Sequence, residues 1–485
     1  MDPIGGKMIN RVKIFLLLTL CFSSPLWGDD PRPNVLFIAV DDLRPEINSF
    51  DAQAMITPNL DRLARSGVRF TRAYCSIATC GASRASLMTS LRPTPDRFRN
   101  YLTRVDHDAP DVTSLPALFK EDGYTTLSNG KIYHHQDDDL RGWSKPPWRP
   151  ETRSISWMKK ENQPTQEEGR RRNGPPVEAA DVPDAEYPDY QICSKTIADL
   201  DQLATQDTPF FLACGFYRPH LPFVAPQKYW DLYPEQSIPL AANDYFPRNL
   251  SRVFRYTWGE LRSYRGIPGK GPVTEETARQ LVHGYRASVS FVDAQIGRLL
   301  DALTRLGLRE NTIIVLWGDH GWQLGEHGFW CKHTNFEVAT HVPLIISAPG
   351  MSRGVACNRL VETIDIYPTL CELAHIPPPA HLQGKSLVPL LLKPDAVHKG
   401  LVFTRWGGGD SVRSDHYRYM EMRADGGRGK LTGKALFDLQ ADPGENQNLA
   451  DRVAYTTVQR KLQAQLDAVR SDFPSPEPPE KPPTK

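Results

Sequence analysis

Three short polar clusters follow apolar runs that have the length and composition of buried strands. Each cluster comes after its own run: Val35–Val40 precedes Asp41-Asp42, Ile313–Trp317 precedes Asp319-His320, and Phe210–Phe216 precedes Arg218-Pro219-His220. In open α/β sheets, ligands bind outside the carboxyl ends of the strands. We therefore expect the three clusters to meet at one edge of a sheet and to form a site there.

The paired carboxylates of Asp41 and Asp42 indicate a cation site. Two adjacent carboxylates repel each other unless a cation or hydrogen bonds hold them. A solvated loop or a helix cap would explain this pair alone, but Asp319 repeats the pattern after a second strand. Oxygen ligands favour a hard cation such as calcium or magnesium. His320 is either a further ligand or a hydrogen-bond donor beside the metal, since imidazole prefers softer metals.

Cys80 opens a predicted helix that begins Cys80-Gly81-Ala82-Ser83-Arg84 and runs to Leu91. At a helix N-terminus the aligned N–H groups lower the pKa of a thiol, so this cysteine is expected to be reactive. A small buried thiol without a chemical role is the alternative that the residues alone leave open.

Alternating strand and helix patterns predict the elements that position these clusters. A fourth apolar run, Val342–Ala348, joins the three above, and runs that are apolar on both faces are typical of a parallel sheet between helices. Helices are predicted after Thr57-Pro58, where proline occupies the first turn, and from about Thr274 to Leu306. The fold class is therefore α/β, with a sheet covered by helices on both faces.

The chain divides into a large catalytic domain, residues 29–380, and a smaller C-terminal α+β subdomain, residues 381–472. Residues 136–190 and 234–272 show little periodicity, and we interpret them as insertions of the kind that carry substrate loops. Beyond residue 384 the pattern changes to short strands, Leu401–Thr404 and Ser411–Arg423, and a final helix, Val458–Val469. The proline-rich residues 473–485 are expected to be disordered.

The N-terminus has the pattern of a secretory signal, since Lys7, Arg11 and Lys13 precede the short apolar run Ile14–Phe22. Residues 1–28 are therefore predicted to be a signal peptide, and the protein to be exported to the periplasm or secreted. No later segment is apolar for long enough to cross a membrane. A net charge of +1 gives no basic field for nucleic acid. Eight cysteines without a close pair exclude a zinc ribbon but allow one or two disulfides.

Cys80 to Leu91, followed by Arg92-Pro93, resembles the signature of the type I sulfatase family, whose core is C-x-P-S-R. Ala82 stands where proline is usual, which leaves open which maturation system acts on the chain. Other segments resemble the family as well: Asp41-Asp42, Thr113–Gly123, Gly130-Lys131-Ile132-Tyr133-His134, Leu436–Leu439 and Asp442–Ala450. Within the family the iduronate-2-sulfatase branch is the most similar, in the segments Val40–Pro45, Arg218–Phe223, Asp319–Gly328 and Ala339–Ile345.

The resemblance implies an alkaline-phosphatase-like fold with a mixed, mostly parallel sheet. It also implies that a maturation enzyme converts Cys80 to formylglycine (3-oxoalanine), and that one Ca²⁺ binds the modified Cys80. By the same resemblance, the metal site is completed by Asp41, Asp42, Asp319 and His320, and Arg84 positions the formylglycine. Lys131 and His134 are implied to assist the aldehyde and take a proton, with His135 as the competing candidate for the role of His134. His220 and Lys332 are implied to bind sulfate and to protonate the leaving oxygen.

The implied activity is hydrolysis of sulfate esters on a sulfated saccharide. The branch adds exo cleavage of the 2-O-sulfate of a uronic acid. A hydrated aldehyde offers one hydroxyl to attack sulfur and a second that lets the resulting intermediate collapse and release sulfate. Two alternatives remain: a formylglycine-dependent phosphodiesterase or phosphonate monoesterase, and an exported glycan-binding protein in which Cys80 is never modified.

Overall fold

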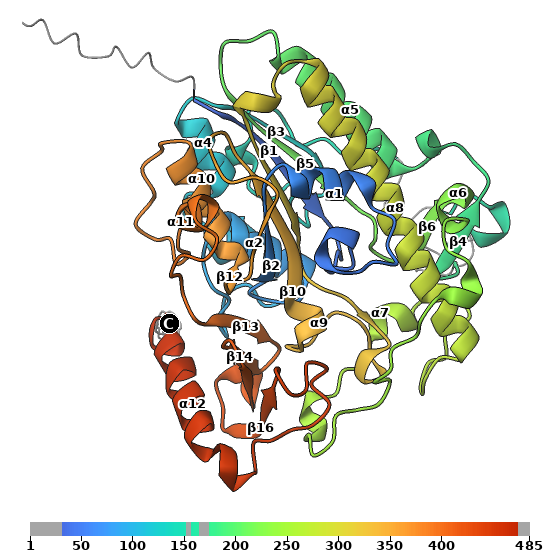
Figure 1. Ribbon diagram of the computed structural model, residues 1–485, viewed down its shortest axis with the longest axis vertical. Coiled ribbons are helices and arrows are strands. Elements are labelled where there is room, and N and C mark those ends of the chain that lie inside the picture. Colours follow the sequence, from blue (N-terminus) through green and yellow to red (C-terminus); the bar gives the residue numbers. More distant parts are fainter. Residues whose placement is uncertain (1–31, 152–156, 164–173, 474–485) are drawn as a thin grey trace, which may run out of the picture. The chain divides into compact units, whose positions relative to one another are not determined.

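The computed structural model describes residues 32–151, 157–163 and 174–473. The predicted signal peptide and the predicted tail beyond Phe473 lie outside these ranges. Within them, the chain forms a large central sheet between two layers of helices, followed by a smaller antiparallel sheet (Figure 1). The predicted α/β class and alkaline-phosphatase-like architecture are confirmed, whereas the domain boundaries stay predictions.

The central sheet has eight strands in the order β11-β2-β10-β7-β1-β5-β3, with β12 paired to β2. In chain order the strands are β1 (Asn34–Val40), β2 (Val68–Tyr74), β3 (Thr125–Gly130), β5 (Phe210–Phe216), β7 (Thr312–Gly318), β10 (His341–Ser347), β11 (Val355–Cys357) and β12 (Val361–Glu362). All four predicted runs are strands of this sheet. β2, β3, β11 and β12 lie outside those runs.

The direction of β10 makes the sheet mixed, as the resemblance implied. β10 pairs antiparallel with both β7 and β2, whereas β1 pairs parallel with β5 and β7. Every residue of β10 from Val342 to Ser347 is buried all the same. An apolar run indicates that both faces of a strand are buried by helices. It does not indicate whether the strand is parallel or antiparallel to its neighbours.

Helices cover both faces of the sheet (Figure 1). On one face Leu36 and Ile38 of β1 pack against α1, α5 and α8; on the other, Val35 and Phe37 pack against α2, α4, α10 and α11. These helices are α1 (Pro58–Arg65), α2 (Cys80–Thr89), α4 (Leu115–Glu121), α5 (Pro188–Leu203), α8 (Glu275–Arg305), α10 (Ile366–Leu373) and α11 (Val388–Leu392). Because successive side chains of a strand point to opposite faces of the sheet, β1 packs against both layers of helices.

The long helix α8 agrees with the pattern that predicted it. Thr274 caps its N-terminus by accepting a hydrogen bond from the amide of Thr277 at 3.2 Å. Glu275 and Glu276 lie in the first turn and Arg305 in the last, each with the charge that the helix dipole favours. Like the other helices in the described ranges, α8 is not apolar enough to cross a membrane.

The C-terminal sheet has the order β13-β14-β15-β16 and is covered by α12. Its elements are β13 (Val402–Trp406), β14 (Gly409–Arg413), β15 (Tyr417–Arg423), β16 (Leu431–Asp438) and α12 (Thr456–Ser471). The predicted strand Ser411–Arg423 is two strands joined by a turn, in which Ser414 donates its amide to the Tyr417 carbonyl at 2.8 Å. The polar residues Ser414-Asp415-His416 mark this turn, and the prediction overlooked them.

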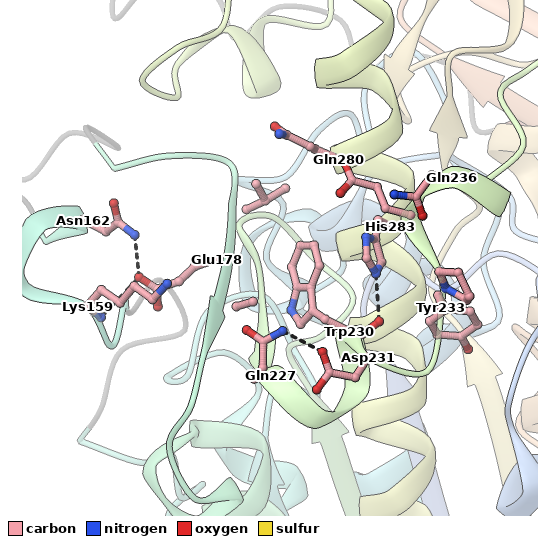
Figure 2. Close-up of a pocket in the computed structure, with 14 residues that line it drawn as sticks. Lys159, Asn162, Glu178, Gln227, Trp230, Asp231, Tyr233, Gln236, Gln280 and His283 are labelled. Atoms are coloured by element: carbon pink, nitrogen blue, oxygen red, sulfur yellow. Dashed lines mark hydrogen bonds between the residues drawn. The ribbon is translucent and has the colours of Figure 1, made fainter.

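The two predicted insertions contain short elements of their own. The first includes β4 (Val177–Ala180), which pairs with β6 (Phe223–Pro226), and the second includes α7 (Gly259–Arg262). Between β4, α6 (Gln227–Trp230) and α8 lies a polar cavity of about 640 Å³, where His283 contacts the Trp230 carbonyl (Figure 2). None of the residues predicted to act in catalysis lines this cavity.

Candidate active site

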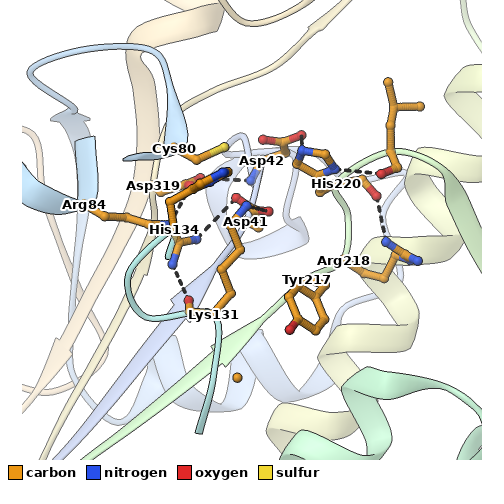
Figure 3. Close-up of polar contacts among 12 residues, drawn as sticks. Asp41, Asp42, Cys80, Arg84, Lys131, His134, Tyr217, Arg218, His220 and Asp319 are labelled. Carbon is orange, nitrogen blue, oxygen red and sulfur yellow. Dashed lines mark hydrogen bonds and ion pairs between the residues drawn. The ribbon is translucent and has the colours of Figure 1, made fainter. Parts of the chain in front are cut away.

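Four neighbouring strands, in the order β7-β1-β5-β3, end at the same edge of the central sheet. The register aligns Val40 with both Phe216 and Gly318, so the residues after β1, β5 and β7 lie at one level. Gly130 ends β3 in the same register. The three clusters predicted from the sequence therefore meet in space, and Lys131 joins them from β3 (Figure 3).

Close backbone contact brings the Lys131 turn against β5. The Lys131 amide donates to the Gly215 carbonyl at 2.8 Å. A Cβ on Gly215 would lie 2.1 Å from the Lys131 carbonyl oxygen, so a side chain at Gly215 would push this turn away. Gly130 has φ +76°, a conformation that glycine adopts at little cost. These two glycines therefore fix where Lys131 enters the site.

Cys80 is the first residue of α2, and its thiol lies at the centre of the site. The residue is 2% exposed, and Sγ is 3.3 Å from Nε2 of His320. A Cβ on Gly81 would lie 2.2 Å from the carbonyl oxygen of Tyr101, so glycine lets the chain cover the start of the helix. Burial, and then the charge of Asp41, raises the pKa of the thiol. The predicted lowering of this pKa is therefore wrong, because desolvation outweighs the helix N-terminus.

The predicted metal ligands converge, together with His220, as two overlapping groups. The ligand atoms within each group all lie within 4.8 Å of one another, and the groups are Asp41, Cys80, Asp319 and His320, and Asp41, Asp42, Cys80 and His220. Asp41, Asp42 and Asp319 are at most 1% exposed. Three buried carboxylates this close together need positive charge among them.

The surrounding cations compensate the carboxylates unevenly. Burial opposes ionisation of Asp41, but Lys131, His220 and Arg84 hold its pKa well below the usual range. Burial raises the pKa of Asp42 in spite of the cations beside it. A divalent cation would supply the charge that Asp42 still lacks, and carboxylate oxygens suit a hard ion. The residues present therefore fit a metal site of the predicted kind.

His320 presents one ring nitrogen to this cluster. Its Nδ1 is 3.0 Å from the Gly321 carbonyl, which accepts only from a protonated nitrogen. Nε2 then carries the lone pair, and it lies 3.4 Å from Oδ1 of Asp42 and 3.6 Å from Oδ1 of Asp319. A lone pair facing carboxylate oxygens is favourable only with a cation between them. A neutral His320 therefore suits the ligand alternative, and an imidazolium in the same place would be the hydrogen-bond donor.

Arg84 is one helical turn beyond Cys80 and ties α2 to the strand ends. Its guanidinium lies 3.0 Å from Oδ2 of Asp319 and 3.3 Å from Oδ1 of Asp41, and it is fully buried. It also donates to the carbonyl oxygens of Lys131 and Ile132. Arg84 therefore fixes the helix start that carries Cys80 relative to three strands.

Lys131 and His134 both lie near Asp41. The Lys131 ammonium donates to Oδ2 of Asp41. Burial, followed by the charge of Lys131, lowers the pKa of His134 to about 2, so its imidazole is neutral. The charges that act on His135 are instead those of Arg104 and Asp137, outside the cluster. The position therefore favours His134 over His135 for proton transfer.

His220 and Lys332 lie on the other side of the cluster, and both face Asp42. The Lys332 ammonium is 3.1 Å from Oδ1 of Asp42, and Nε2 of His220 is 3.9 Å from Oδ2. Both also contact Glu260, which the sequence had not indicated. Burial disfavours the imidazolium, but Asp42 and Glu260 raise the pKa of His220 to about 9.

Comparison with known proteins identifies the family. The sulfatase family model matches residues 33–376, and the model for the C-terminal part of N-sulphoglucosamine sulphohydrolase matches residues 325–472. The chain belongs to the type I sulfatase family. It is a sulfuric ester hydrolase, and the resemblance seen in the motifs is confirmed. Sulfatases generally use a formylglycine and a metal ion.

Two curated sulfatases and one solved structure illustrate the similarity. Iduronate 2-sulfatase from Mus musculus is 36% identical over 387 residues, covering 71% of this chain and 69% of that protein. A sulfatase from Formosa agariphila is 34% identical over 490 residues, covering 94% and 92%. A phosphonate monoester hydrolase from Silicibacter pomeroyi shares the fold, with a TM-score of 0.75, 24% identity, and coverage of 91% and 95%.

Proposed function

We propose that this sulfatase removes sulfate from a sulfated saccharide, using a formylglycine made from Cys80 and one bound Ca²⁺. The observation that carries the proposal is the position of Cys80 at the head of α2, where its Sγ lies within 4.8 Å of ligand atoms of Asp41, Asp319 and His320. A structural thiol has no reason to be buried among carboxylates, which raise its pKa and offer it no apolar packing.

The formylglycine would supply a nucleophile derived from its aldehyde. The Ca²⁺ would activate this nucleophile and bind a sulfate oxygen. The chain supplies the rest. Asp41, Asp42, Asp319 and His320 would hold the cation together with residue 80, and Arg84 fixes the helix that carries this residue. These buried groups are set before substrate arrives, which lowers the cost of reorganisation during the reaction.

Two pairs of residues would move protons on opposite sides of the sulfur. Lys131 and His134 would together take up the proton released at residue 80. His220 and Lys332 carry protons on the other side of Asp42, where the leaving oxygen would depart. The two histidines differ in charge state, His134 being neutral and His220 protonated, as expected when one accepts a proton and the other donates one.

The substrate we propose is a uronic acid with a 2-O-sulfate, cleaved by exo action. Its support is the similarity to iduronate 2-sulfatases, at 36% identity over 71% of the chain. A carboxylated sugar needs a cationic partner, and the first insertion contains one in Arg149. Trp148 pairs with the edge of β3, so Arg149 emerges at the same level as the Lys131 turn.

Arg149 is unlike the other cations of the site. Its guanidinium donates to the carbonyls of Gly130 at 3.3 Å, Tyr133 at 2.7 Å and His134 at 3.2 Å. Among the described residues it contacts carbonyl oxygens and no carboxylate. Burial lowers its pKa, and the charges of Tyr217, Asp41 and Asp137 act in the opposite direction. We assign to Arg149 the recognition of an anionic group on the sugar.

We further propose that the chain is exported by the signal at residues 1–28, and that a maturation enzyme modifies Cys80. Mass spectrometry of the peptide containing Cys80, in protein with measured activity, tests the modification. Rates on unsaturated uronate-2-sulfate disaccharides, 6-O-sulfated hexosamines and sulfated galactans test the substrate. A preference for either of the latter would leave the sulfatase family assignment intact and exclude the uronate proposal.

A phosphonate monoesterase or phosphodiesterase activity is the second candidate, and its support is the likeness in fold to the hydrolase from Silicibacter pomeroyi. Rates on an aryl sulfate and on a phosphate diester with the same leaving group separate the two activities. We expect the sulfate to be the better substrate.

A further inference from the structure

Glu260 brings the second insertion into direct contact with the proposed proton donors. It lies in α7, and its Oε1 is 3.1 Å from Nε2 of His220 while its Oε2 is 3.0 Å from Nζ of Lys332. One carboxylate therefore spans both side chains. Only 11% of the Glu260 side chain is exposed, so the contact is shielded from bulk water.

The insertion holds Glu260 through a neighbour in the same short helix. Arg262 donates to the Thr257 carbonyl at 3.0 Å and to the Gly271 carbonyl at 2.9 Å, which closes the loop on both sides of α7. The same guanidinium lies 3.2 Å from the centre of the Trp258 ring. Glu260 thus projects from an anchored segment.

The two donors need such an anchor for different reasons. Nδ1 of His220 is 2.7 Å from the Leu221 carbonyl, which leaves the ring only one nitrogen to direct at a reacting atom. Lys332 has a compact ammonium on a flexible stem, with three donors that rotate freely. Asp42 alone would draw both groups toward the metal ligands. Glu260 pulls from the other side, so each donor is held between two carboxylates.

We propose that Glu260 is a positioning residue that aims His220 and Lys332 at the leaving oxygen. This inference rests on the proposed function, which gives those two residues the leaving group. Because the effect passes through proton donation, it depends on how much the leaving group needs a proton. An aryl sulfate with an acidic phenol needs little help, whereas an alkyl or sugar sulfate needs most of it.

The test is the Glu260→Gln variant of the mature, metal-loaded enzyme on aryl sulfates whose phenols span a wide pKa range. Glutamine keeps the shape but loses the charge that holds both donors. We expect kcat/KM to fall by about 10- to 100-fold on the poorest leaving groups, as for a misplaced catalytic group, and by less than about threefold on 4-nitrophenyl sulfate. Glu235→Gln, an exposed carboxylate of the same insertion, is the matched control and should change neither.

A double-mutant cycle separates positioning from a merely structural role. In a His220→Gln background, Glu260→Gln should cost much less than it does in the unaltered enzyme, because its partner is already absent. Additive losses, equal losses on all aryl sulfates, or no loss at all would each overturn the inference. The aryl series needs no sugar, so a failure of the uronate proposal would not affect this result. Thermal unfolding of each variant checks that the fold is retained.

Discussion

The two sides of the active site are built in different ways. On the metal side, Asp41, Asp42 and Asp319 are attached directly to the ends of β1 and β7 and are almost completely buried. On the leaving-group side, His220 lies on a loop and Glu260 in the short helix α7 of the second insertion, and their side chains are 14% and 11% exposed. The sheet therefore fixes the groups that act on every sulfate ester. The loops complete the part that meets the rest of the substrate.

This difference matters because a loop can change in sequence and conformation, whereas the register of the sheet strands cannot change without displacing the site. A shift of one residue in β1 would turn its side chains to the opposite face and displace both carboxylates. A change in residues 234–272 would alter Glu260 and its neighbours without moving the strands. The contrast predicts that substitutions on the metal side abolish reaction on every substrate, whereas those on the leaving-group side act selectively.

The largest effect is expected at Cys80. Cys80→Ser should lower kcat by about 10⁴-fold or more on all sulfate esters, because serine offers no second hydroxyl to expel the sulfate. Single-turnover kinetics on an aryl sulfate provide the measurement. Cys357→Ser is the control, since its Sγ donates to the Pro394 carbonyl at 3.2 Å and a hydroxyl can do the same. Sustained turnover by Cys80→Ser would contradict the proposed nucleophile.

Asp41→Asn tests the metal side without touching the nucleophile. We expect a loss of about 10³-fold on good and poor leaving groups alike, since a bound cation contributes several kcal/mol to the transition state. Chelation should have the same effect, and added Ca²⁺ should reverse it in the unaltered enzyme. Metal analysis should find one ion per chain, and Asp231→Asn serves as an exposed control. Two ions per active chain would favour phosphatase-like chemistry instead.

Substitutions of His220 and Lys332 test the other side. His220→Gln and Lys332→Met should each lower kcat/KM on sugar sulfates by roughly 10²- to 10⁴-fold, the usual contribution of a general acid. The loss should shrink on aryl sulfates with acidic phenols. His283→Gln, in the separate cavity beside Trp230, is the control. If both substrate classes lose activity equally, the two residues only hold the sulfate, and the sides do not differ as proposed.

The smallest expected effect concerns substrate choice at Arg149. Arg149→Gln should raise KM for uronate-2-sulfates by about 10-fold or somewhat more, the value of one hydrogen bond to a charged group. Rates on a neutral aryl sulfate should stay nearly constant. Arg141→Gln is the control, because this guanidinium also donates to carbonyls, those of Pro110 and Val112, but lies at the surface. A matching loss on aryl sulfate would show that Arg149 only supports the Lys131 turn.

The same contrast explains what could be predicted from the sequence. Asp41, Asp42 and Asp319 follow apolar runs directly, and strands that run parallel bring their ends to one edge, so a local pattern indicated a site. The motif around Cys80 then supplied the family and the remaining residues. The direction of β10 was harder to predict, since this strand has the same apolar pattern as the parallel strands of the sheet.

Glu260 and Arg149 could not be predicted in this way. Both lie in segments without periodicity, and a glutamate or arginine in such a segment is usually solvated. Their roles arise from contacts between residues far apart in the chain, such as Glu260 with Lys332. The raised pKa of Cys80 was missed for a similar reason. A helix N-terminus can be recognised locally, but desolvation depends on everything packed around it.

The burial of Cys80 has a consequence for how the enzyme is made. With 2% of the residue exposed and the Tyr101 backbone against Gly81, the described part of the chain leaves this thiol hardly accessible to another protein. Under the proposed modification, a maturation enzyme would therefore meet the segment while it is still extended, during synthesis or before folding is complete. Modification and folding then compete in time. A chain that folds first would keep its cysteine permanently, as a stable but inactive product.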